Sequence, residues 1–163
     1  MKNNEFEEYS LARISILAAA YAAVTILITP IAYGPIQFRI SDVLLPLPYN
    51  RKFGGKNAVI GLTIGTLIAN LASPFGIWDQ VIGTFATFFG VAGAYYMRRF
   101  KYGMIFAAIM PVISVTILIG FVLLYLVYDI LPLWLDILGV FVGEIVTSGF
   151  GGYLLLRKLE TVS

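Results

Sequence analysis

The sequence predicts an all-α integral membrane protein with six transmembrane helices and with both termini in the cytoplasm. Of its 163 residues, 60% are hydrophobic and only 12% are charged, whereas a soluble domain carries about 25% charged residues. The placement of Lys and Arg supports the number of helices, as described below. We expect a single multi-pass domain in the cell membrane, because membrane-length segments with short connections use nearly all of the chain.

Six apolar segments divide the chain. Their approximate ranges are 11–33, 37–49, 57–73, 77–97, 104–128 and 133–156. A spanning helix needs roughly 17 to 25 residues, so four segments are long enough and the third is at the lower limit. The second contains Pro46 and Pro48 and is too short for a regular spanning helix.

The basic residues test whether the short second segment crosses the membrane, since cytoplasmic loops are enriched in Lys and Arg. With six crossings and a cytoplasmic N-terminus, Arg39 alone of the eleven basic residues lies outside. Without that crossing, six more would join it outside: Arg51, Lys52, Lys56, Arg98, Arg99 and Lys101. We therefore expect the second segment to cross.

Small residues predict where helices approach one another closely. They recur at every fourth position in the third segment (Gly61, Gly65, Ala69) and in the sixth (Gly139, Gly143, Thr147, Gly151). The first segment contains two alanine pairs, Ala18/Ala22 and Ala19/Ala23. These pairs could pack internally or could form a face for another membrane subunit.

The composition excludes several kinds of chemistry. With no Cys and no His, the chain has no disulfide, no thiolate or imidazole metal ligand, and none of the common triads. We expect no enzyme activity, no metal and no cofactor. A net charge of +2 without a dense basic run argues against nucleic acid as a partner. The chain also has no phosphate-binding loop of the P-loop kind, so any ATP must be used by another subunit.

Five acidic residues fall in or near the outer half of the membrane: Asp42, Asp79, Asp129, Asp136 and Glu144. We expect Asp129 and Asp136 to be solvated loop residues or helix caps. Glu144 lies eleven residues past Leu133, which places it roughly 16 Å below the outer end of its helix. An ionised acid at that depth costs about 3 kcal/mol or more. It should therefore face an interior cavity with a partner, or be protonated and hydrogen-bonded between helices.

The remaining polar residues of the outer half have both structural and ligand-binding interpretations. Arg39 could pair locally with Asp42 or anchor the chain at the interface, and Asp79 could cap the fourth helix. Asn70 could make an interhelical hydrogen bond. If these side chains meet beside Trp78, they form an outward-opening pocket with carboxylates, an arginine and an indole. Such a pocket suits a small, planar, nitrogen-rich ligand.

Two stretches, GPIQFRISDVLLPLPYN and GLTIGTLIANLASPFGIWDQVIGTFAT, resemble the QueT family of queuosine-precursor transporters. Members of this family are substrate-binding S components of energy-coupling factor (ECF) transporters. The two stretches fall within residues 34–87, and the six-helix topology of an S-component-like bundle covers the whole chain. The resemblance places the Ala-x-x-x-Ala subunit-coupling motif of S components on Ala18 and Ala22. The family commonly has Glu where this sequence has Asp42.

The resemblance implies a deazaguanine ligand such as preQ1 or preQ0. From charge and depth we expect Glu144 to accept the adjacent N–H groups of the guanine-like edge. The cationic arm of preQ1 would pair with Asp79 or Asp42, and Arg39 would donate to the exocyclic carbonyl. We expect the other ligand-binding residues to be Asn70, Gln37 and, by stacking on the ring, Trp78.

The resemblance also implies partners, namely a transmembrane T component and two ATPase subunits. Three other functions stay open from the sequence. The chain could be an S component for another vitamin or nucleobase, or a secondary transporter that uses protons at Glu144. A small intramembrane enzyme is the third, and it would need paired catalytic groups that the sequence does not offer. Nothing in the sequence separates preQ1 from preQ0 or queuine.

Overall fold

A computed structural model describes residues 9–33, 37–128 and 132–162, which contain helices and turns and no strand. The all-α class is therefore confirmed for this part of the chain. The elements of the first half are α1 (Leu11–Leu27), α2 (Thr29–Ala32), the 3-10 helices η1 (Ile40–Leu44) and η2 (Leu47–Tyr49), α3 (Gly55–Ala69) and the 3-10 turn η3 (Asn70–Ala72). Those of the second half are α4 (Gly76–Tyr96), the 3-10 turn η4 (Met97–Arg99), α5 (Gly103–Val115), the π-helical η5 (Thr116–Tyr128), α6 (Leu133–Glu144), the π-helical η6 (Ile145–Gly151) and α7 (Gly152–Val162).

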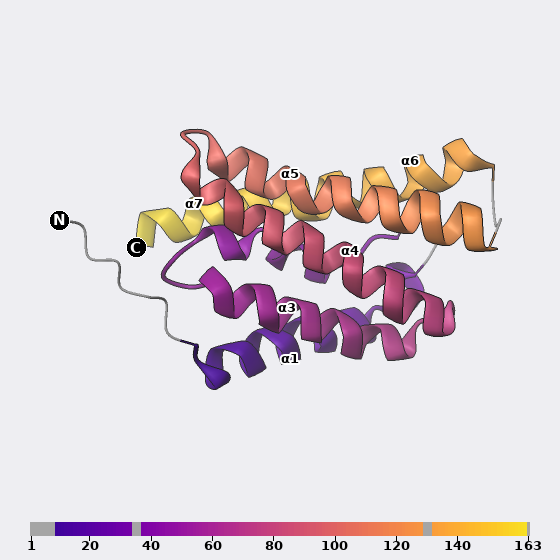
Figure 1. Ribbon diagram of the computed structural model, residues 1–163, viewed down its shortest axis with the longest axis horizontal. Coiled ribbons are helices and arrows are strands. Elements are labelled where there is room, and N and C mark those ends of the chain that lie inside the picture. Colours follow the sequence, from indigo (N-terminus) through magenta and orange to yellow (C-terminus); the bar gives the residue numbers. More distant parts are fainter. Residues whose placement is uncertain (1–8, 34–36, 129–131, 163) are drawn as a thin grey trace.

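The long helices lie side by side along the long axis of the molecule (Figure 1). α1 packs against α3, α3 against α4, and α4 against α5. The stretch from α6 to α7 forms one nearly continuous helix beside α5 and η5. α1 begins and α7 ends at the same end of the bundle (Figure 1).

The short second segment is a broken helix inside the bundle. η1 contacts α1, η6 and α7, and η2 contacts α3 and α4. Proline has no N–H to donate and cannot continue a helical ladder, so Pro46 and Pro48 divide the segment into short 3-10 turns. One of these turns is closed by the Tyr49 N–H, which donates to the Pro46 carbonyl at 3.0 Å. The segment therefore carries polar side chains into the interior on irregular backbone.

The outer surface of the bundle is apolar. Exposed aromatic and aliphatic residues in the middle of helices include Phe85, Phe89, Leu138, Phe141 and Phe150. Two helical stretches, Gly103–Tyr128 and Leu133–Val162, are long and apolar enough to cross a membrane, and α1 is apolar but shorter. An apolar exterior around a polar interior is the arrangement of a protein whose surface faces lipid. The number of crossings and the side of the termini stay predictions.

Glycines of α3 allow a close contact with α1. A methyl group at Gly65 would lie 2.8 Å from the Ala18 carbonyl oxygen, and one at Gly61 would lie 2.7 Å from that of Ile14. Ala18 and Ala22 are each 5% exposed and lie in this α1–α3 interface. The first alanine pair therefore packs internally, whereas Ala19 and Ala23 are exposed on the opposite side of α1.

The middle of the long final helix, Leu133–Val162, packs on the broken segment. A methyl group at Gly152 would lie 2.5 Å from Pro46, and one at Gly151 would lie 2.9 Å from the Val43 side chain. The absence of a side chain at these two positions lets α7 and η6 approach η1 closely. This contact brings the end of α6 near the polar residues of η1.

Candidate functional site

Arg39 is the central charge of a buried polar cluster. Its side chain is 3% exposed, and its guanidinium group lies 4.7 Å from the centre of the Tyr33 ring. Nε donates to the Ala32 carbonyl oxygen at 3.4 Å, and Nη2 lies 3.6 Å from Oδ2 of Asp79. The charge partner of Arg39 is therefore on α4, forty residues along the chain, and the local Arg39–Asp42 pair is not the arrangement observed.

Asp79 does not cap its helix. It lies in the first turn of α4, but no side chain makes a capping hydrogen bond there. Its carboxylate is fully buried, and neither oxygen has a hydrogen-bond partner. The ion pair with Arg39 therefore balances the charge of Asp79 and leaves its hydrogen-bonding capacity unused.

Asp42 and Glu144 bring two carboxyl groups together at the centre of the cluster. Asp42 is on η1 and accepts a hydrogen bond from the hydroxyl of Tyr21 on α1. Glu144 is the last residue of α6, is 1% exposed, and its carboxyl group interacts with that of Asp42. Two carboxylates so close repel each other, so a shared proton or a bound cation would stabilise the pair.

Asn70 and Tyr33 support the ion pair. The Tyr33 hydroxyl shares its one proton between Oδ1 of Asn70 at 3.1 Å and the Ala69 carbonyl oxygen at 3.0 Å. Nδ2 of Asn70 donates to the backbone carbonyl of Asp79 at 2.9 Å. The sequence offered two roles for Asn70, an interhelical hydrogen bond or contact with a ligand, and the structure shows the hydrogen bond. Through this bond Asn70 positions the start of α4.

Gln37 has an unusual backbone conformation. Its φ is 42°, in the left-handed region that residues other than glycine rarely adopt. The side chain is 2% exposed, and its Nε2 has no hydrogen-bond partner. Strained backbone of this kind often marks a functional site.

Several buried polar atoms of this cluster have no hydrogen-bond partner. They are Nη2 of Arg39, both carboxylate oxygens of Asp79 and Oε2 of Glu144, and Nε2 of the buried Gln37 is a further such atom. Leaving such a group unsatisfied costs about 1–3 kcal/mol. Asp79 is on α4 and Glu144 on α6, so the unpartnered carboxylate oxygens of the cluster come from two separate helices and are candidates for contact with a polar ligand.

Trp78 is not brought into the cluster. Its side chain is 53% exposed, although that of Asp79 beside it is fully buried. Successive residues of an α-helix point about 100° apart, so the two side chains leave α4 in different directions. The aromatic rings that adjoin the cluster belong to Tyr33 and Tyr21, and neither was identified from the sequence.

Gly83 packs against the cluster, and it too was not identified from the sequence. It lies one turn after Asp79 on α4, and a methyl group there would lie 2.5 Å from Nδ2 of Asn70 and 2.7 Å from Oδ1 of Asp79. Its four-residue spacing from Asp79 was the available signal.

Of the two acids expected in loops or caps, Asp136 is buried at 1% exposure, and Asp129 lies outside the described residues.

A buried charged cluster inside an apolar helical bundle defines a membrane protein with a candidate site for a polar ligand. The sequence matches the family described as QueT transporter over residues 11–161, so the chain belongs to that family. It is 36% identical over 97 residues to the Queuosine precursor transporter QueT of Lactococcus lactis subsp. cremoris (strain MG1363). The match covers 57% of this chain and 54% of that relative, so the chain spans about half the relative's length. No solved structure matches the chain.

The Arg39–Asp79 pair can be tested with a double-mutant cycle. Arg39→Gln and Asp79→Asn should each lower the free energy of unfolding by about 3–5 kcal/mol, because each leaves one buried charge uncompensated. The double variant should lose less than the sum of the two, with a coupling of about 1–3 kcal/mol. Chemical unfolding in detergent measures these values, and the exposed Arg99→Gln provides the control. Additive losses would show that the two side chains do not act as a pair.

Proposed function

We propose that this chain is the substrate-binding S component of an ECF transporter. In this proposal it is a multi-pass protein of the cell membrane and has no catalytic role. It captures a queuosine precursor, a deazaguanine such as preQ1 or preQ0, from outside the cell for ATP-driven uptake. Membership of a transporter family and the name of the relative support the substrate class. The observation that carries the proposal is the buried excess of carboxyl groups, with three acids near one arginine in the described cluster.

The hydrogen-bond donors and the positive charge of preQ1 match the excess of buried carboxyl groups. A guanine-like edge presents adjacent N–H donors that one carboxylate can accept together. Glu144 is suited to this role because Oε2 has no partner within the protein. The aminomethyl arm carries a positive charge, and Asp42 is its better partner because Asp79 is already paired with Arg39.

The other polar groups of the cluster would fix the orientation of the base. The unpartnered Nε2 of Gln37 and the guanidinium group of Arg39 are donors for an exocyclic carbonyl. Asn70 would act through Asp79, since both ends of its amide are already hydrogen-bonded. We do not include Trp78, because its side chain lies on the exposed surface.

The partners follow from what the sequence does not contain. Without a phosphate-binding loop, the chain would depend on a transmembrane T component and two ATPase subunits for release of ligand into the cell. We propose Ala19 and Ala23 as the coupling surface, because small exposed residues permit close helix approach. Ala18 and Ala22 are less suitable, since α3 already covers them.

Ligand binding tests the proposed substrate class. The purified chain should bind preQ1 and preQ0 and should not bind guanine, riboflavin or thiamine, as measured by calorimetry in detergent. Glu144→Gln and Asp42→Asn should each weaken preQ1 binding by roughly 10-fold to 100-fold, the cost of one charge-assisted hydrogen bond. Asp42→Asn should affect preQ0 less, because preQ0 has no cationic arm.

The matched control for these variants is Glu160→Gln, which removes an exposed carboxylate near the opposite end of α7 from the cluster. It should bind preQ1 as the unaltered chain does. Tight binding of riboflavin or thiamine would instead indicate an S component for a different vitamin. Binding of preQ1 that is unaffected by Glu144→Gln would exclude the proposed site.

A proton-coupled secondary transporter is the second candidate, and the Asp42–Glu144 contact favours it. Neighbouring carboxyl groups can share a proton and release it when a cation binds. Uptake of preQ1 into proteoliposomes distinguishes the two functions. The S-component proposal predicts uptake only with the T component, the ATPases and ATP, and no effect of a protonophore. Uptake by the isolated chain that a protonophore abolishes would establish the alternative.

A further inference from the structure

The basic residues of the described chain are concentrated at one end of the bundle. Apart from Arg39, they lie near the beginning of α1, between η2 and the start of α3, at or just after η4, or in α7. These parts of the chain lie at the same end of the bundle (Figure 1). They are Arg13, Arg51, Lys52, Lys56, Arg98, Arg99, Lys101, Arg157 and Lys158. This is the end that we expect in the cytoplasm.

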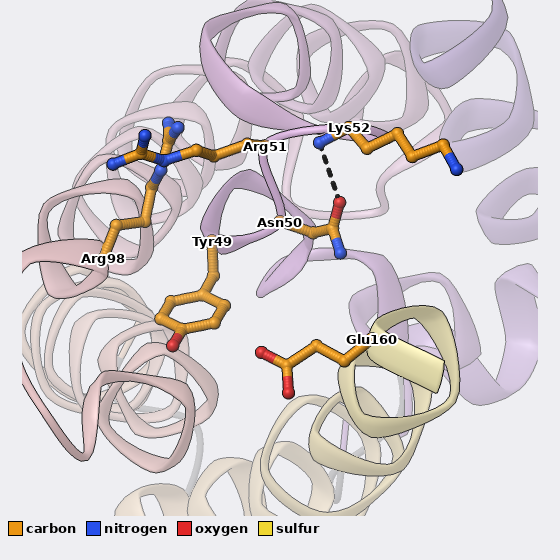
Figure 2. A pocket seen from close by; sticks show the side chains of 6 residues that line it. All are labelled: Tyr49, Asn50, Arg51, Lys52, Arg98 and Glu160. Carbon is orange, nitrogen blue, oxygen red and sulfur yellow. Dashed lines mark hydrogen bonds between the residues drawn. The ribbon is translucent and has the colours of Figure 1, made fainter. Parts of the chain in front are cut away.

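A pocket of about 280 Å³ opens within this basic end. Its lining residues come from η2 and the loop after it, from η4 and from α7: Tyr49, Asn50, Arg51, Lys52, Arg98 and Glu160. Figure 2 shows the guanidinium groups of Arg51 and Arg98 at one side and the Glu160 carboxylate directed inward from α7. Three basic residues and one acid give the lining a net charge of +2.

The loop that carries Arg51 and Lys52 is held in one conformation. Oδ1 of the buried Asn50 accepts hydrogen bonds from the Lys52 and Phe53 N–H groups at 3.0 Å each (Figure 2 shows the first). The Asn50 backbone carbonyl accepts two more, from the N–H groups of the next two glycines. The first of these, Gly54, has no room for a side chain, since a methyl group would lie 2.0 Å from a backbone oxygen of η2. The basic side chains are therefore presented from an ordered turn.

Aromatic rings surround the basic residues at this end. Five of the basic side chains lie over a ring: Lys52 over Phe53, Lys56 over Tyr9, Arg98 over Tyr95, Arg99 over Tyr96 and Lys101 over Tyr102. Most of these rings are exposed, with Tyr102 the most so at 64%. Exposed aromatic rings beside Lys and Arg are typical of the level of lipid headgroups. The pocket therefore opens where the phosphate groups of a leaflet would lie.

We propose that this pocket binds the phosphate group of an anionic phospholipid headgroup. Guanidinium groups bind phosphate by paired, charge-assisted hydrogen bonds, and here two arginines line the same pocket. A negatively charged inner leaflet is attracted to basic residues at the membrane surface. This inference is independent of the substrate and requires that the bundle is embedded in a membrane with its basic end at the inner leaflet.

Native mass spectrometry of the full chain with phosphatidylglycerol and phosphatidylcholine tests the lipid site. The unaltered chain should retain phosphatidylglycerol in preference to the zwitterionic lipid. The double variant Arg51→Gln/Arg98→Gln should weaken phosphatidylglycerol binding by about tenfold or more, the effect of losing charge-assisted bonds. Glu160→Gln should strengthen it, because it removes the one acidic group that faces the phosphate.

The matched control is Arg99→Gln/Lys101→Gln, which removes the same charge from exposed positions outside the pocket. It should change lipid binding by less than about twofold. Equal losses in both double variants would overturn the proposal, since they would indicate general attraction to the basic end. So would displacement of the lipid by inorganic phosphate at equal concentration, which would indicate a soluble ligand.

Two further measurements keep this test separate from folding and from the substrate site. The unfolding temperature of each variant reports its stability, and the single variant Arg51→Gln, at an exposed position, should lose part of the lipid affinity without unfolding. Calorimetry with preQ1 should give the same affinity for the double variant as for the unaltered chain. Unchanged phosphatidylglycerol binding in folded Arg51→Gln/Arg98→Gln would exclude the pocket as the lipid site.

Discussion

The buried charge of Arg39 is the interaction on which the site and much of the fold depend. A guanidinium group that is 3% exposed inside an apolar bundle requires a nearby anion, and Asp79 provides it at 3.6 Å. Because Arg39 lies at the start of the broken segment and Asp79 lies in the first turn of α4, their pairing joins two elements that are distant in sequence. Tyr33 and Asn70 join the same contact through hydrogen bonds to each other and to α4. A substitution in this cluster should therefore alter stability and ligand binding together.

The broken second segment brings the acidic side chains together. An uninterrupted helix would satisfy its own backbone, whereas the short 3-10 turns on either side of Pro46 place Asp42 deep in the bundle. Small residues then allow the neighbouring elements to close around it, with Gly152 against the proline ring and Gly83 beside Asp79. The result is a polar interior and an apolar exterior, as a membrane environment requires. The polar atoms left without partners in this interior are the physical basis of the proposed binding site.

The sequence was most informative where the charge of a residue and its position along a helix alone decide whether its side chain is buried. It predicted the all-α class, and the expected depth of Glu144 predicted a buried acid, either facing a cavity with a partner or hydrogen-bonded between helices; Glu144 is buried in the structure. It could not predict the Arg39–Asp79 contact, because no local spacing relates the two residues. Trp78 and Asp79 are adjacent, and only tertiary packing decides which of them faces inward. For the same reason the two alanine pairs could not be separated into a buried and an exposed face before α3 was placed against α1.

Hydrogen–deuterium exchange of the purified chain with and without preQ1 tests most directly whether the buried cluster is the ligand site. Residues 37–44 lie on short, irregular turns and should exchange readily in the free protein. The account predicts that preQ1 slows exchange there and at residues 76–83 and 140–147, and leaves residues 97–106 and 152–162 unchanged. Protection confined to the basic end of the bundle, with no effect at residues 37–44, would contradict the account.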